Sequence, residues 1–152
     1  STEPRLMLYA LLKLSHVLAV MLWVGGMAFA HFFLRPAVQA LDPPQRLALM
    51  QRVLQRFLNA AGIAVLVAVA SGALMMALGS RSAHINLMAG LGLVMAAIYG
   101  HVRFALYPRL ARAVAAQDWP AGASAMAQVR RWVAVNLVLG VLVTALAIPQ
   151  VH

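Results

Sequence analysis

The amino-acid sequence predicts an all-α integral membrane protein that folds as a bundle of four transmembrane helices. Of its 152 residues, 64% are hydrophobic and only 10% are charged, whereas soluble domains contain roughly 45–50% apolar and about 25% charged residues. A soluble domain of this size exposes too much surface to bury so many apolar side chains, and disordered chains are poor in such residues. The apolar residues also gather in four long runs. These observations exclude a soluble globule and a disordered chain.

Each apolar run is long enough to cross a bilayer, which takes about 20 mainly apolar residues in a helix. The expected spans cover residues 6–34, 57–79, 83–107 and 132–148. They leave two polar links, at residues 35–56 and 108–131, and we expect one transmembrane domain over residues 1–152. Asp42 precedes a Pro-Pro pair, and Asp118 precedes Trp119-Pro120. An acid followed by an early proline is typical of a helix start, so we expect residues 44–56 and 109–117 to extend or flank the spans as short surface helices.

Positive charge is concentrated in and beside the two longer links. Most of the 12 Lys and Arg residues lie there, and only Arg5, Lys13 and Arg81 lie elsewhere. Because cytoplasmic loops of membrane proteins are enriched in Lys and Arg, we expect both links to be cytoplasmic and both termini to be periplasmic. The net charge of +9 is then a signal of membrane topology. We expect the lipid bilayer as a partner and no nucleic acid.

The candidate ligands for a metal or cofactor are histidines and methionines. The sequence contains no cysteine, which excludes disulfides, thiolate metal sites and covalent c-type haem. Ionisable residues inside a span are costly and by default indicate function. His16 and His84 precede Arg35 and Arg103 by the same number of residues, and His31 and His101 lie close to those arginines. The four histidines therefore form an external and a cytoplasmic level, roughly 22–26 Å apart at the helical rise per residue.

At the external level, histidine and methionine are expected to form a site for Cu(I). Helical periodicity aligns His84 with Met88, and it places Met75 and Met76 at the end of the preceding span, near the level of His16. Thioether and imidazole are soft ligands that suit Cu(I). Filling of the bundle core by methionine is the alternative interpretation of the same side chains.

Haem b is the alternative cofactor, bound between the first and third spans. Neutral imidazoles can ligate haem iron on both faces. His16 and His84 would be the axial ligands of one haem, and His31 and His101 those of a second. The alternative interpretation of each of these histidines is a hydrated residue near the headgroups, a turn residue or a residue of a packed core. The alternative for the whole chain is an accessory subunit without metal.

The chain resembles the copper-resistance protein D (CopD) family of bacterial membrane proteins. The motifs that carry the resemblance are Leu14-Ser15-His16, Trp23-Val24-Gly25-Gly26, Phe33-Leu34-Arg35-Pro36, the stretch from His84 to His101, and Arg130-Arg131 with Asn136-Leu137. The resemblance implies a protein of the bacterial inner membrane that moves or sequesters copper. It would place His16, together with His84 and Met88, at the metal.

A second resemblance is to HemJ-type protoporphyrinogen oxidases, which bind b-type haem. It rests on His84-Ile85-Asn86-Leu87 and on Tyr99-Gly100-His101. That family has a lysine where Asn86 stands here, which argues against the oxidase activity but not against haem. The copper interpretation implies transport or binding and a periplasmic copper donor. The haem interpretation implies an oxidoreductase or electron carrier with a redox partner, and a homo-oligomer is compatible with both.

Overall fold

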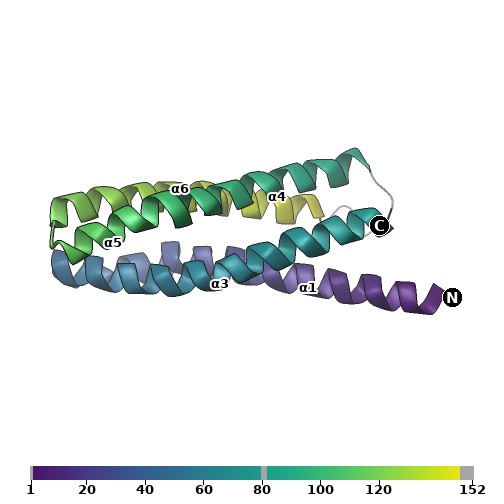
Figure 1. The fold of residues 1–152 in the computed structure, drawn as a ribbon, viewed down its shortest axis with the longest axis horizontal. Coiled ribbons are helices and arrows are strands. Elements are labelled where there is room, and N and C mark those ends of the chain that lie inside the picture. Colours follow the sequence, from purple (N-terminus) through teal and green to yellow (C-terminus); the bar gives the residue numbers. More distant parts are fainter. Residues whose placement is uncertain (1, 80–81, 148–152) are drawn as a thin grey trace.

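The computed structural model describes residues 2–79 and 82–147, and in these ranges it is helical except at short turns and contains no strand (Figure 1). The chain runs in order through α1 (Thr2–Phe29), η1 (Ala30–Leu34), α2 (Arg35–Val38), α3 (Pro43–Leu78), α4 (Ala83–His101), η2 (Val102–Leu106), α5 (Tyr107–Ala115) and α6 (Trp119–Ala147). Four stretches are long and apolar enough to cross a membrane: Thr2–Val38, Pro43–Leu78, Ala83–Ala115 and Trp119–Ala147. The predicted all-α class with four membrane-spanning helices is confirmed.

The helices extend well beyond the spans that the sequence predicts. α3 has 36 residues, which corresponds to roughly 54 Å at the helical rise, against a hydrocarbon core about 30 Å thick. Residues 43–56 are the first turns of α3, and residues 119–131 are the first turns of α6. The helical segment expected at residues 44–56 is therefore continuous with the span that follows it. The one expected at residues 109–117 corresponds to α5, which continues the preceding span through η2. Asp118 caps α6 through Oδ1, which accepts from the backbone N–H of Ala121 at 3.3 Å.

The two halves of the chain repeat the same order of elements: a long helix, a π-helix, a shorter helix, a turn and a second long helix. η1 ends two residues before Pro36, and η2 ends two residues before Pro108. Proline has no N–H to donate, and its ring clashes with the carbonyl of residue i−4. A widened π turn absorbs this clash without ending the helix. Both helices consequently continue as one rod past their prolines.

Two packed cores hold the bundle together. α1 packs against α3 and α6, whereas α4 packs against α6 and α3. The first core lies where α5 joins the bundle and contains Leu106 and Leu110, which are 1% and 0% exposed. The second lies farther along the helices and contains Trp23, Met27 and Met95. The chain is therefore packed most extensively at the end that carries α2 and α5.

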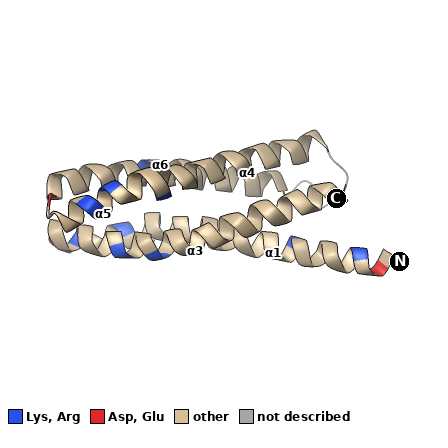
Figure 2. Ribbon diagram, viewed as in Figure 1, with Lys and Arg blue, Asp and Glu red and all other residues tan. Residues whose placement is uncertain are grey.

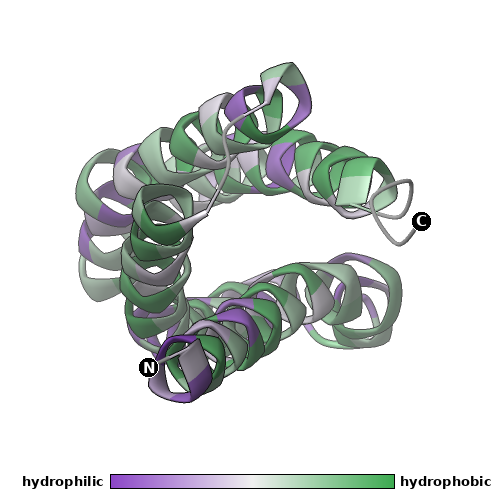
Figure 3. Cartoon of the chain, turned by 90° about the vertical axis from the view of Figure 1, so that its right-hand side faces the viewer, coloured by the Kyte–Doolittle hydropathy of each residue, from purple (hydrophilic) through white to green (hydrophobic). Residues whose placement is uncertain are grey.

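Hydrophobic residues lie on the outer as well as the inner faces of the helices (Figure 3). Leu6, Ile63 and Leu66 are 69%, 68% and 72% exposed. A helix that is hydrophobic on all sides is typical of a membrane span, because lipid and not water then contacts its outer face. The exposed apolar surface is thus consistent with a multi-pass membrane protein.

Basic residues gather at one end of the bundle, around α2, α5 and the first turns of α3 and α6 (Figure 2). α1 begins at the opposite end, where α3 and α6 end and α4 begins (Figure 1). The predicted segregation of charge between the two ends is confirmed. The assignment of these ends to cytoplasm and periplasm stays a prediction.

Glycine lets the helices approach closely at two places. A Cβ at Gly26 of α1 would overlap the ring of Phe57 on α3, and a Cβ at Gly140 of α6 would lie 2.7 Å from Val24 of α1. Small residues at helix interfaces are the usual way in which membrane helices gain van der Waals contact. Gly25, next to Gly26, has open space at its Cβ position.

We predict that Gly26→Ala destabilises the bundle by about 1–3 kcal/mol, the usual cost of overpacking, because the added methyl group meets Phe57. Gly25→Ala is the matched control and leaves stability unchanged or slightly raised, since nothing lies within 4 Å of the new atom. Thermal unfolding of both variants in detergent measures the difference. Equal midpoints for the two variants would show that α1 and α3 do not pack as described.

Candidate functional site

His16 on α1 is held against α3 by its ring nitrogen Nδ1. That atom lies 2.8 Å from the carbonyl oxygen of Ala68 and 3.2 Å from Oγ of Ser71. Ser71 Oγ donates its own proton to the carbonyl of Val67 at 2.5 Å. Since a carbonyl oxygen only accepts hydrogen bonds, Nδ1 must carry a proton and donate it. The other nitrogen, Nε2, then keeps a free lone pair.

Small side chains on α3 make room for this ring. Ser71 is buried, and a Cβ on the adjacent Gly72 would lie 3.2 Å from Cε1 of His16. Any larger residue at position 72 would push the imidazole away from Ala68. α3 therefore fixes both the position and the tautomer of His16, as second-shell partners do for metal-ligating histidines.

Met75 lies one helical turn beyond Ser71 on the same face of α3, because residues four apart in a helix are neighbours. Met75 and Met76 are both half-buried. The carbonyl of Met75 accepts from the N–H of Gly79, and a Cβ at Gly79 would lie 3.8 Å from the ring of Tyr9. The thioethers of Met75 and Met76 are thus at the end of the bundle at which α1 begins, beyond His16.

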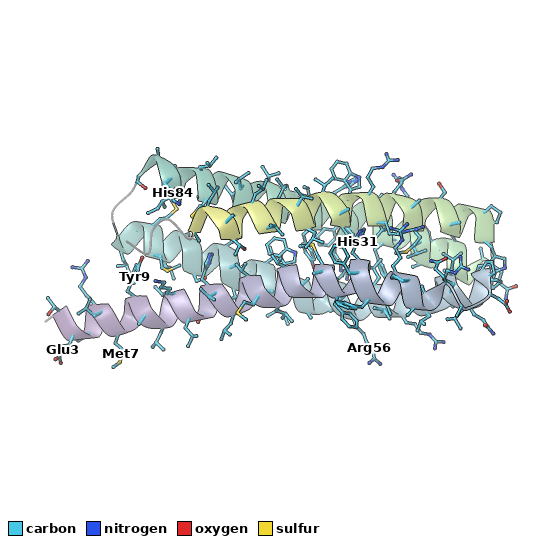
Figure 4. All side chains as sticks on the ribbon, turned by 180° about the vertical axis from the view of Figure 1, so that it is seen from behind. Glu3, Met7, Tyr9, His31, Arg56 and His84 are labelled. Carbon is cyan, nitrogen blue, oxygen red and sulfur yellow. The ribbon has the colours of Figure 1, made fainter. Side chains whose placement is uncertain are left out.

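His84 lies at the same end, in the first turn of α4 (Figure 4). The helix begins at a Ser82 cap whose Oγ accepts from the N–H of Ile85 at 3.2 Å. Nε2 of His84 is buried and has no hydrogen-bond partner among the described residues. Buried polar atoms are normally satisfied, so this atom is available for a ligand. Met88 lies one turn further along the same helix face and is half-buried.

His16 lies on α1 and His84 lies on α4, and these two helices do not pack along each other. α1 contacts α3 and α6, and α4 contacts α6 and α3. Within residues 2–79 and 82–147, no three His, Asp or Glu side chains gather into a metal-binding group. A metal site built from the predicted residues would therefore need the methionine sulfurs in addition to the two imidazoles.

The two histidines predicted at the cytoplasmic level have different surroundings. His31 lies in η1 and lines a cavity of about 50 Å³ between α1, α3 and α6, together with Arg35 and Arg130. His101 is exposed and packs the edge of its ring against Trp132, with 5.5 Å between the ring centroids. Each lies at a π-helix, His31 inside η1 and His101 just before η2. Their roles as haem ligands stay predictions.

Two polar residues, Asn136 and Ser71, are buried in the interior of the bundle. Asn136 of α6 is 3% exposed and donates from Nδ2 to the carbonyl of Met95 on α4 at 3.2 Å, whereas its Oδ1 is buried without a partner. Ser71 was not singled out by the sequence analysis. Its signal is a hydroxyl beside a glycine in an otherwise apolar run, four residues before Met75.

Comparison with known families matches residues 51–148 to the family described as Copper resistance protein D. The chain belongs to the copper resistance protein D family. This confirms the first of the two resemblances, and the second, to HemJ-type haem proteins, is not shown. No curated protein and no solved structure matches the CopD chain. The matched segment contains Ser71, Met75, Met76, His84 and Met88, whereas His16 lies before it.

We predict that neutral His16 carries its proton on Nδ1 in the metal-free CopD protein. The opposite tautomer would set the Nδ1 lone pair against the carbonyl oxygen of Ala68 at 2.8 Å, which is electrostatically repulsive. Nitrogen-15 chemical shifts of labelled histidine, assigned by comparison with His16→Ala, measure the tautomer. A proton on Nε2 would contradict the contact between His16 and α3. The exposed His101 provides an internal reference for an imidazole without this contact.

Proposed function

We propose that this CopD-family protein binds Cu(I) at the end of the bundle at which α1 begins, and moves or sequesters it across the membrane. The observation that carries the proposal concerns two imidazole nitrogens. The contact of Nδ1 with the carbonyl of Ala68 leaves Nε2 of the neutral His16 ring with a lone pair, and Nε2 of His84 is buried with no hydrogen-bond partner among the described residues. Both occur beside helix faces that carry half-buried methionines. Copper is the cargo in this proposal, and the ligands are His16, His84, Met75, Met76 and Met88.

The chemistry of these side chains suits Cu(I). Imidazole and thioether are soft enough for this ion, whereas hard cations prefer carboxylates. The carboxylate of α1 that is nearest in sequence to His16 is that of Glu3, at the beginning of the helix. The hydrogen bond from Nδ1–H of His16 to the carbonyl of Ala68 fixes the orientation and the tautomer of the ring. His16 is therefore proposed as the principal ligand, with α3 acting as its positioning element.

We further propose that the copper end faces the periplasm of a bacterial inner membrane. The support is the positive-inside rule, because most of the basic residues lie at the opposite end of the bundle (Figure 2). A periplasmic copper donor would then deliver the ion to His16 and His84. Transport across the bundle would also need contacts beyond this end, either deeper in the chain or from a second copy.

Haem b is the second candidate, and the same unpartnered nitrogens favour it, since a neutral imidazole ligates iron as well as copper. It requires a porphyrin that reaches both α1 and α4. In the haem interpretation the protein would be an electron carrier or an oxidoreductase with a redox partner. A visible spectrum of the purified protein separates the two candidates, because only haem gives a Soret band that shifts on reduction.

We predict that His16→Ala and His84→Ala each weaken Cu(I) binding more than tenfold, since each removes one of few nitrogen ligands. Titration of the purified protein with Cu(I) against a chromogenic chelator, under anaerobic reducing conditions, measures the affinity. Met75→Leu is expected to weaken binding as well. The matched controls are His101→Ala and Met21→Leu, which alter exposed side chains.

The proposal fails if His16→Ala binds Cu(I) as tightly as the unmodified chain while remaining folded by circular dichroism. It also fails if the purified protein shows a Soret band and binds no Cu(I). Loss of binding in the two control variants would mean that the titration reports general unfolding and not a site at His16 and His84.

A further inference from the structure

A second cavity lies at the opposite, basic end of the bundle and is separate from the His16 region. It is enclosed by α2, the first turns of α3 and the first turns of α6, and its volume is about 130 Å³. One water needs only about 10–15 Å³ of such space, so this cavity admits a group of several heavy atoms. It adjoins the cavity beside His31, because both are lined by Arg35, Met50, Met126 and Arg130.

Three arginines from three different segments line this cavity. Arg35 begins α2, Arg46 lies in the first turns of α3, and Arg130 lies on α6. All three are half-buried, whereas the other arginines of the predicted links are exposed: Arg52, Arg56, Arg109, Arg112 and Arg131. The exposed arginines are explained by membrane topology alone. The cavity arginines are turned inward, and topology does not explain that orientation.

Among the described residues, no acidic side chain lines the cavity to neutralise its three arginines. Arg35 and Arg46 lie close enough to Arg130 for their charges to repel it. The chain has three acidic residues; Glu3 lies at the far end of the bundle, and neither Asp42 nor Asp118 lines the cavity in the part of the chain that is described. Like charges that share a partly dehydrated site destabilise it unless a counter-charge is present.

One of these guanidinium groups also has an unused donor. Nε of Arg130 is buried and has no hydrogen-bond partner. Arg46, in contrast, donates from Nε to the carbonyl of Val38 at 3.3 Å and from Nη2 to that of Leu41 at 3.1 Å. These bonds fix Arg46 at the cavity wall without neutralising it. The site thus combines a fixed positive charge with a buried N–H that points to no protein acceptor.

We infer that this cavity binds the phosphate group of an anionic ligand. Guanidinium presents a planar fork of donors that matches phosphate oxygens, and it is weakly hydrated, so it suits partly buried anion sites. A phosphate in the cavity would accept from guanidinium N–H groups of the lining arginines and would relieve the repulsion among Arg35, Arg46 and Arg130. Two sources offer this chemistry: the headgroup of an anionic phospholipid, and a phosphate group dissolved in the adjoining aqueous phase.

The test compares Arg130→Gln with Arg131→Gln, which remove the same charge from adjacent positions on α6. The full chain is reconstituted in phosphatidylcholine nanodiscs, and its thermal midpoint is measured with phosphatidylglycerol in the bilayer, with inorganic phosphate in the buffer, or with neither. Sodium chloride at matched ionic strength controls for screening. Native mass spectrometry of the released protein counts retained phosphatidylglycerol. Arg56→Gln, whose side chain projects away from the bundle (Figure 4), is a second control.

We predict that one of the two phosphate sources raises the midpoint of the unmodified chain by about 5 °C, the shift expected for a ligand well above its Kd. The rise persists in Arg131→Gln and Arg56→Gln and is lost in Arg130→Gln. An effect of phosphatidylglycerol, with one retained lipid per chain, identifies the headgroup. An effect of inorganic phosphate alone identifies a soluble ligand.

The inference is overturned if neither source stabilises the unmodified chain beyond the chloride control, a comparison that needs no variant to fold. It is also overturned if Arg130→Gln responds to phosphate as Arg131→Gln does. Should Arg130→Gln fail to fold, Arg35→Gln takes its place against the same controls. Cu(I) affinity is expected to be equal in all these variants, so this result stands or falls independently of the copper site.

Discussion

Backbone hydrogen bonding in lipid is the constraint on which the rest of this structure depends. The hydrocarbon core offers no partner for an exposed N–H or C=O, so a spanning segment must satisfy these groups within itself. The chain passes Pro36 and Pro108 through η1 and η2 without ending either helix. Hydroxyl side chains of the spans follow the same rule, since Ser71 donates to Val67 and Thr144 donates to Gly140 within their own helices.

The two ends of the bundle carry different chemistry because different residues are left over once the helices are packed. At one end, α5 and the extended helices bury a continuous apolar core, and arginines lie around it. At the other, the small residues Ala68, Ser71 and Gly72 receive the ring of His16. The proposed copper ligands and the proposed phosphate site are therefore far apart along the helices.

Much of the candidate site was accessible from sequence. Histidines inside apolar spans stand out because burying them is costly, and helical periodicity predicts that His84 and Met88 share one face. The acceptor for His16 was not accessible, because a backbone carbonyl such as that of Ala68 has no sequence signature. The burial of Arg130 beside the exposed Arg131 was equally hidden. Two adjacent arginines look identical in a charge count, and only the rotation of α6 turns one of them toward the cavity.

The sequence by itself determined the class of protein, the number of spans and the end of the bundle at which each charge lies. These properties follow from hydropathy and length, which are additive along the chain. The tertiary structure decided which helices are neighbours, namely that α1 packs on α3 and that α4 packs on α6. It also decided which nitrogen of His16 is free and which arginines share a cavity. These features depend on close contacts such as Gly26 against Phe57, and close contacts are set by the shapes of both partners at once.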